Sequence, residues 1–143
     1  RARTANAPSV PGEHEHWDLF DAGATIGPGE VYVLCHSSSD PTILDECDEA
    51  GGSWTNGDDG FCLAKGPEAD GDYIDCVGDF SADPGTAWEV CGVGDTKDNT
   101  LVRKTEITTG NPDWSVTSNS ASCEWDVYPN DTWTYLGYHP YLD

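Results

Sequence analysis

The sequence is poor in basic residues and has no long apolar run. Of its 143 residues, only 6 are Lys or Arg, against 27 Asp or Glu, which gives a formal net charge of −21 at pH 7. A field of this sign repels the phosphates of nucleic acids and of anionic lipids, so we expect neither as a partner. No stretch is long and apolar enough to predict a membrane span. The charge is instead typical of a solvated acidic surface, with a bound cation or a basic partner as alternatives.

The sequence also lacks the motifs of several common enzyme chemistries. It has no GxSxG nucleophile elbow, and no glycine-rich loop that leads into a helix through Lys and then Ser or Thr. It has no CxxC pair, which argues against a zinc ribbon or a thioredoxin-like site. Pairs of acids occur by chance among 27 carboxylates and identify no acid–base pair. We therefore predict no catalytic residue and no enzyme activity.

Cysteines are present in an even number, which favours disulfides formed in an oxidising compartment. We therefore expect a secreted or lumenal protein, and the first residues, RARTANAPSVPG, are typical of a processed chain or of a loop interior. The sequence alone does not choose among the many pairings of six thiols. Proximity along the chain suggests one ordering: Cys35 with Cys47, Cys62 with Cys76, and Cys91 with Cys123.

The scattered turn residues and the aromatic content indicate an all-β class. Sixteen Gly and nine Pro separate short segments, while six Trp, six Tyr and three Phe supply large apolar surfaces. Residues 1–16 are predicted to be an extended N-terminal arm, and residues 17–143 one domain. A short helix is expected over residues 41–47, capped by Asp40. The predicted strands span residues 30–35, 60–65, 73–78, 100–107, 125–128 and 133–137.

A few residues are candidates for binding or modification. The acids Asp58, Asp59, Asp70 and Asp72 could hold calcium outside an EF-hand, because Tyr73 stands where the EF-hand loop requires Gly. Solvated turn acids are the alternative reading of the same residues. No other cofactor is expected. The sequon at Asn130 lies in a predicted turn and is a candidate glycosylation site.

Five segments, taken in order, resemble the lamin-tail domain family in its secreted, prokaryote-type branch. They are IGPGEVYVLCHSSSDPTILDECD (residues 26–48), NGDDGFCLAKG (56–66), YIDCVGDFSADPGTAWEV (73–90), DNTLVRK (98–104) and CEWDVYPNDTWTYLGYH (123–139). The resemblance implies an immunoglobulin-like β-sandwich with long loops and one short helix, stapled by disulfides. It brings no catalytic residues with it. Similar domains accompany secreted phosphoesterases and nucleases or occur on cell-surface proteins.

The N-terminal segment departs from the family pattern, since RARTANAPSVPGEHEH stands where an opening strand region is expected. A sandwich without its first strands would expose a sheet edge, which proteins normally cover. We therefore expect another chain or a precursor fragment to complete the sheet by strand addition. Residues beside that edge, His14, His16 and Trp17, are the candidate partner-binding residues.

Two functions follow from these observations. The favoured one is a non-catalytic structural or protein-interaction module that belongs to a larger secreted or lumenal assembly. The alternative is a calcium-dependent adhesion or glycan-binding module, which would use the turn carboxylates and exposed Trp side chains.

Overall fold

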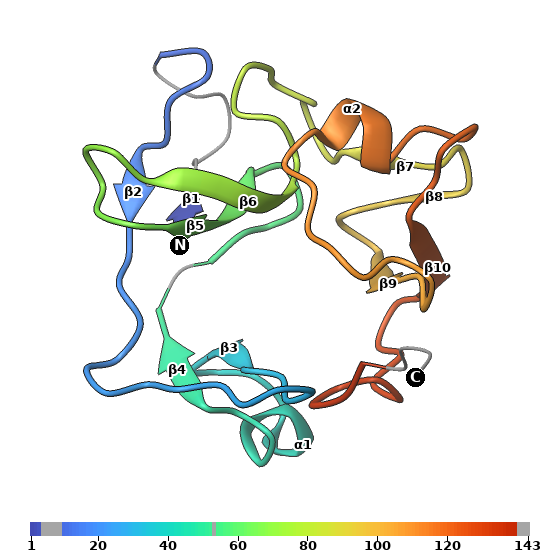
Figure 1. Cartoon of the computed structure of the whole chain (residues 1–143). Coiled ribbons are helices and arrows are strands. Elements are labelled where there is room, and N and C mark those ends of the chain that lie inside the picture. The colour runs from blue at the N-terminus through green and yellow to red at the C-terminus, as the bar shows by residue number, and fades with distance from the viewer. Residues whose placement is uncertain (4–9, 53, 140–143) are drawn as a thin grey trace.

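A computed structural model describes residues 1–3, 10–52 and 54–139 as a small β-rich domain with three disulfides (Figure 1). The β-rich class predicted from the sequence is thereby confirmed. The strands form one four-stranded sheet and three two-stranded pairs, and the two helices are single turns. Among the described residues, no helix is both apolar and long enough to span a bilayer.

The four-stranded sheet is antiparallel and has the order β2-β1-β5-β6. Its strands are β1 (Ala2–Arg3), β2 (His16–Trp17), β5 (Phe61–Lys65) and β6 (Asp72–Val77). The predicted hairpin is confirmed as β5–β6, with Cys62 directly opposite Cys76. These two cysteines and Phe80 form a buried cluster, against which Trp17 and Tyr73 pack.

Both ends of the segment predicted as an extended N-terminal arm, residues 1–16, contribute strands to this sheet. Ala2 and Arg3 pair with Cys62 and Phe61 of β5 on one side and with β2 on the other. At Phe61 and Cys62, β5 is thus paired on both sides within the chain. Residues 4–9 lie outside the described part of the structure.

A second group of elements forms around β3 (Leu34–His36), which pairs in parallel with β4 (Glu49–Gly51). The connection holds α1 (Pro41–Leu44), whose N-terminus is capped as predicted: Asp40 Oδ1 accepts from the Thr42 N–H at 2.9 Å. The helix ends at Leu44 rather than at residue 47, since the chain turns over the next two residues.

The strand predicted over residues 30–35 begins later, at Leu34, and ends later, at His36. The Val33 N–H bonds to the Asp48 carboxylate at 2.7 Å, and the Val33 carbonyl accepts from the N–H groups of Asp48 and Glu49. A side chain therefore takes the place of a ladder partner at Val33, and regular pairing begins only at Leu34.

A third group contains β7 (Glu89–Val90), β8 (Gly94–Asp95), β9 (Asn99–Arg103), β10 (Trp125–Pro129) and α2 (Trp114–Thr117). Its core comprises Trp88, Val90, Cys91, Trp114 and Trp125. Figure 1 shows this group to one side of the four-stranded sheet, with the β3–β4 group below.

Strand predictions in this third group were correct for β10 and partly correct for β9. Strand β9 ends at Arg103 rather than at residue 107, because the Ile107 N–H closes a turn onto the Lys104 carbonyl. Residues 133–137, predicted as a strand, form turns, with Leu136 N–H bonded to Trp133 O. Helix α2 was not predicted.

Candidate binding surface

The disulfides follow the ordering that proximity along the chain suggested. Cys35–Cys47, Cys62–Cys76 and Cys91–Cys123 join Cα atoms 6.0, 4.1 and 5.5 Å apart. One bond joins β3 to the residue range between α1 and β4, one ties the β5–β6 hairpin, and one links the β7–β8 turn to the segment before β10. Each group of elements thus contains one disulfide-closed loop. Closing loops in this way lowers the entropy of the unfolded chain.

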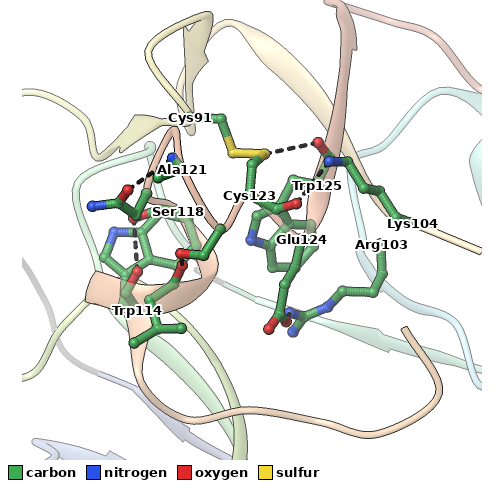
Figure 2. The surroundings of a disulfide bond; sticks show 12 residues. Cys91, Arg103, Lys104, Trp114, Ser118, Ala121, Cys123, Glu124 and Trp125 are labelled. Atoms are coloured by element: carbon green, nitrogen blue, oxygen red, sulfur yellow. Dashed lines mark hydrogen bonds and ion pairs between the residues drawn. A yellow bond between two sulfur atoms is a disulfide. The ribbon is translucent and has the colours of Figure 1, made fainter. Parts of the chain in front are cut away.

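Arg103 is the centre of a charged and aromatic cluster beside the third disulfide (Figure 2). Its guanidinium lies 4.0 Å from the centre of the Trp125 ring and forms ion pairs with Asp75 and Glu124. Asn111 strengthens the cluster, because its backbone N–H donates to Asp75 at 3.1 Å and its amide to Glu124 at 3.3 Å. Two carboxylates already neutralise Arg103, so the cluster ties β6, β9 and β10 together and leaves no cation free for an anionic ligand.

The four acids proposed for calcium do not gather into a site. Asp70 and Asp72 are exposed at the β5–β6 turn, and Asp58 and Asp59 are half-buried in the loop before β5. Within the described ranges, no group of three or more His, Cys, Asp or Glu side chains is placed to hold a metal ion.

Of the three predicted partner-binding residues, His14 and Trp17 make contacts within the chain, whereas His16 is exposed. His14 lies 2.8 Å from the Tyr73 hydroxyl and 3.2 Å from the Glu68 carboxylate, and its ring packs 5.1 Å from that of Trp17. Burial raises the pKa of Tyr73. His16 is exposed on β2. His14 and Trp17 therefore help to fix β2 on the sheet.

The predicted glycosylation residue, Asn130, lies in a turn after β10, where its side chain is exposed. Its amide oxygen accepts from the Asp131 N–H at 3.0 Å, and the Thr132 hydroxyl donates to the Pro129 carbonyl at 2.7 Å. The turn expected from the sequence is present.

Arg1 joins the four-stranded sheet to the β3–β4 group. Its guanidinium donates to Glu49 Oε1 at 2.7 Å, and both side chains are only 9% exposed. It also lies 5.3 Å from the Phe20 ring centre and 4.8 Å from that of Trp54. The hydrogen bond from Arg1 lowers the pKa of Glu49, although burial of the carboxylate acts in the opposite direction. We call these four residues the Arg1 junction.

An apolar groove of about 390 Å³ opens next to the Arg1 junction. Phe20 contributes to both, and its ring meets that of Tyr32 edge-on at 5.4 Å. The Tyr32 hydroxyl donates to Glu49 at 3.3 Å, which ties the groove wall to the junction. Several apolar side chains of the groove remain open to solvent: Ile26 is 59%, Leu63 44% and Phe20 36% exposed. The lining residues are Phe20, Ala24, Thr25, Ile26, Tyr32, Leu34 and Leu63.

Sequence reasoning did not find either feature. Arg1 and Glu49 are 48 residues apart, so no local pattern connects them. The groove combines a loop with two strands from different sheets. The one signal in the sequence was a set of apolar residues, including Ile26, that precede the strand predicted from residue 30.

Comparisons with models of protein families, with curated proteins and with solved structures found no match to this chain.

Proposed function

We propose that this chain is a non-catalytic, disulfide-stapled module that binds another polypeptide in a secreted or lumenal setting. The observation that carries the proposal is the apolar groove, whose walls are held by the Arg1 junction and whose side chains are exposed. Exposed, contiguous apolar surface on a rigid scaffold is typical of an interaction site. The three disulfides support an oxidising location.

The proposal includes the fold family. The five segments that resemble lamin-tail domains support an immunoglobulin-like β-sandwich, and the β-rich architecture with three disulfides is compatible with it. In this interpretation the module is an accessory part of a larger assembly, and its ionic clusters serve the scaffold. The Arg103 cluster is an example, because all of its charged groups are engaged with one another.

A selection of peptides from a random displayed library tests this function. The oxidised protein is the bait, and the same protein after reduction and alkylation is the control. We expect sequences that share a consensus to be enriched on the oxidised protein alone. Failure of any consensus to emerge would contradict a binding function, and reproducible hydrolysis of phosphoesters or glycosides would contradict the non-catalytic assignment.

A further inference from the structure

Four carboxylates, those of Asp21, Glu30, Asp48 and Glu49, belong to segments next to the apolar groove, and we call them the rim. Asp21 directly follows the groove residue Phe20, and its backbone N–H donates to Glu49 Oε2 at 3.0 Å. Glu30 turns back onto the loop that forms the groove, where it accepts from the Gly27 N–H at 2.7 Å. Asp48 accepts from the Val33 N–H, one residue from the groove residue Tyr32.

The negative charges near the groove affect the pKa of Tyr32, which lies in the groove wall. Its pKa is raised, first by burial and then by the negative charges of Glu49, Asp21 and Asp48. An ionised phenol in this position would be repelled by these three carboxylates, which adds to the effect of burial.

Few positive charges oppose this rim among the described residues. The Arg1 guanidinium is nearby, but Glu49 already pairs with it. Lys65 lies two residues beyond Leu63 on β5 and is the other basic residue close in sequence to a groove residue. Since the whole chain carries a net charge of −21, a positively charged partner is attracted both locally and from a distance.

Taken with the proposed function, on which this inference rests, the groove and its rim define one occupant. We propose that the groove takes an aliphatic or aromatic side chain from a partner polypeptide whose flanking residues are Lys or Arg. The apolar side chain enters among Phe20, Ile26 and Leu63, where all three contribute exposed apolar surface. The flanking cations meet the rim carboxylates, of which Asp21 and Glu30 are exposed. Burial of the anchor supplies affinity, and the charges supply selectivity and rapid association.

The size of the groove agrees with this occupant. A volume of about 390 Å³ falls at the lower end of the range of ~300–1,000 Å³ that binding pockets occupy. One or two apolar side chains fit such a space, whereas a long amphipathic helix would need a more extended groove.

Three synthetic peptides, titrated into the isotopically labelled full chain and followed by amide NMR shifts, test the proposal. The first carries one leucine between two pairs of lysines, the second replaces leucine by serine, and the third replaces the lysines by glutamates. We expect saturable shifts at Phe20, Ile26 and Leu63 with the first peptide only. The apparent affinity should fall as salt rises, because the rim charges are exposed.

Matched variants locate the binding. Ile26→Ser and, independently, Leu63→Thr should each weaken the first peptide about tenfold, because each removes part of the wall around a buried anchor. Val93→Ser, at a 73% exposed apolar residue between β7 and β8, should leave the affinity unchanged. Asp21→Asn should weaken binding and reduce its salt dependence, whereas Asp126→Asn on β10 should do neither.

Several results would overturn the inference. Equal binding of the serine peptide, with no effect of Ile26→Ser, would show attraction by charge alone. If the glutamate peptide bound as tightly as the lysine peptide, the rim carboxylates would have no part in selecting the partner. Absence of binding would remove the groove as a site for basic segments, and shifts at groove residues that depend on protein concentration without peptide would assign it to a second copy of this chain. The library selection separates these outcomes from failure of the proposed function, since a consensus without basic residues would refute only the present inference.

Discussion

At the scale of single residues, two arginines connect parts of the chain that are distant in sequence. Arg103 joins Asp75 of β6 to Glu124 beside β10, and Arg1 joins β1 to Glu49 of β4. Both guanidinium groups also lie against aromatic rings, Trp125 for Arg103 and Phe20 and Trp54 for Arg1. Both kinds of contact depend on the planar guanidinium group, which can pair with a carboxylate in a forked geometry and stack on a ring, whereas the ammonium group of Lys is not planar.

Replacing Arg103 tests the first connection. Arg103→Ala leaves Asp75 and Glu124 without their cation, so we expect the free energy of unfolding to fall by about 2–3 kcal/mol, between the values for exposed and fully buried pairs. Arg103→Lys should recover only part of the loss, because ammonium cannot bind two carboxylates as a fork. Urea denaturation measures both changes. Lys97→Ala, at an exposed loop position, should alter the value by less than about 0.5 kcal/mol, and an equal loss there would refute the role of Arg103.

The Arg1 junction should make stability depend on pH through Glu49. Its pKa is lowered from an ordinary value of 4.5, so ionised Glu49 stabilises the folded state above that pH. The contribution is lost as pH falls through the lower, folded-state pKa. Glu49→Gln should therefore lower the melting temperature at pH 7, and the difference from the unaltered protein should shrink in acid below about pH 4.5. Thermal melts across pH 3–7 check this. A difference that stays constant across the series, or an equal effect of Asp126→Asn, would contradict it.

At the scale of elements, the short strand β1 connects two other strands of the four-stranded sheet. It lies between β2 and β5, so its backbone satisfies ladder positions of both neighbours. An unpaired strand edge invites association with other chains.

Removing residues 1–3 should therefore expose β5 and β2. We expect faster hydrogen exchange in the part of β5 that pairs with β1, residues 61–62, and association at high protein concentration. Arg1→Ala is the matched control, since it removes the junction and retains the backbone of β1. Equal exchange in both variants would mean that the guanidinium alone, rather than the strand, protects β5.

Local patterns predicted the elements whose partners lie close in sequence. The β5–β6 hairpin has a short acidic turn and cysteines on both arms, and Asp40 followed by Pro41 marks the start of α1. Those signals depend on neighbouring residues alone. The strand expected over residues 30–35 failed because the Asp48 carboxylate, distant in sequence, occupies the Val33 N–H.

The parts that local patterns missed depend on long-range contacts. A two-residue strand such as β1 carries no periodicity, and only its position beside Phe61 and Cys62 makes it a strand. The groove arises in the same way, since Phe20, Leu34 and Leu63 become neighbours only after the sheet and the β3–β4 group have formed. Paired cysteines were predictable because each bond joins consecutive cysteines of the chain.

At the scale of the whole molecule, the net charge of −21 opposes compaction. Sodium chloride should therefore raise the melting temperature, since the screening length falls from about 30 Å at 0.01 M salt to about 10 Å at 0.1 M. The three disulfides limit the effect of this repulsion by restricting the unfolded chain.

Calcium and magnesium chloride at equal concentration distinguish screening from a specific calcium site. We expect equal shifts of the melting temperature, because the four candidate acids, Asp58, Asp59, Asp70 and Asp72, form no group able to hold a metal ion. A larger, saturable rise of the melting temperature with calcium would support the alternative of a calcium-dependent adhesion module, because a ligand that binds only the folded state stabilises it.

One affinity measurement decides whether the disulfide-bonded scaffold presents a binding groove. The strongest peptide from the library selection is titrated, by fluorescence anisotropy, into the oxidised protein and into the reduced and alkylated protein. We expect saturable binding to the oxidised form and a loss of at least about tenfold on reduction, since the groove wall at Leu34 adjoins Cys35 and that at Leu63 adjoins Cys62. Equal affinity for both forms would contradict it.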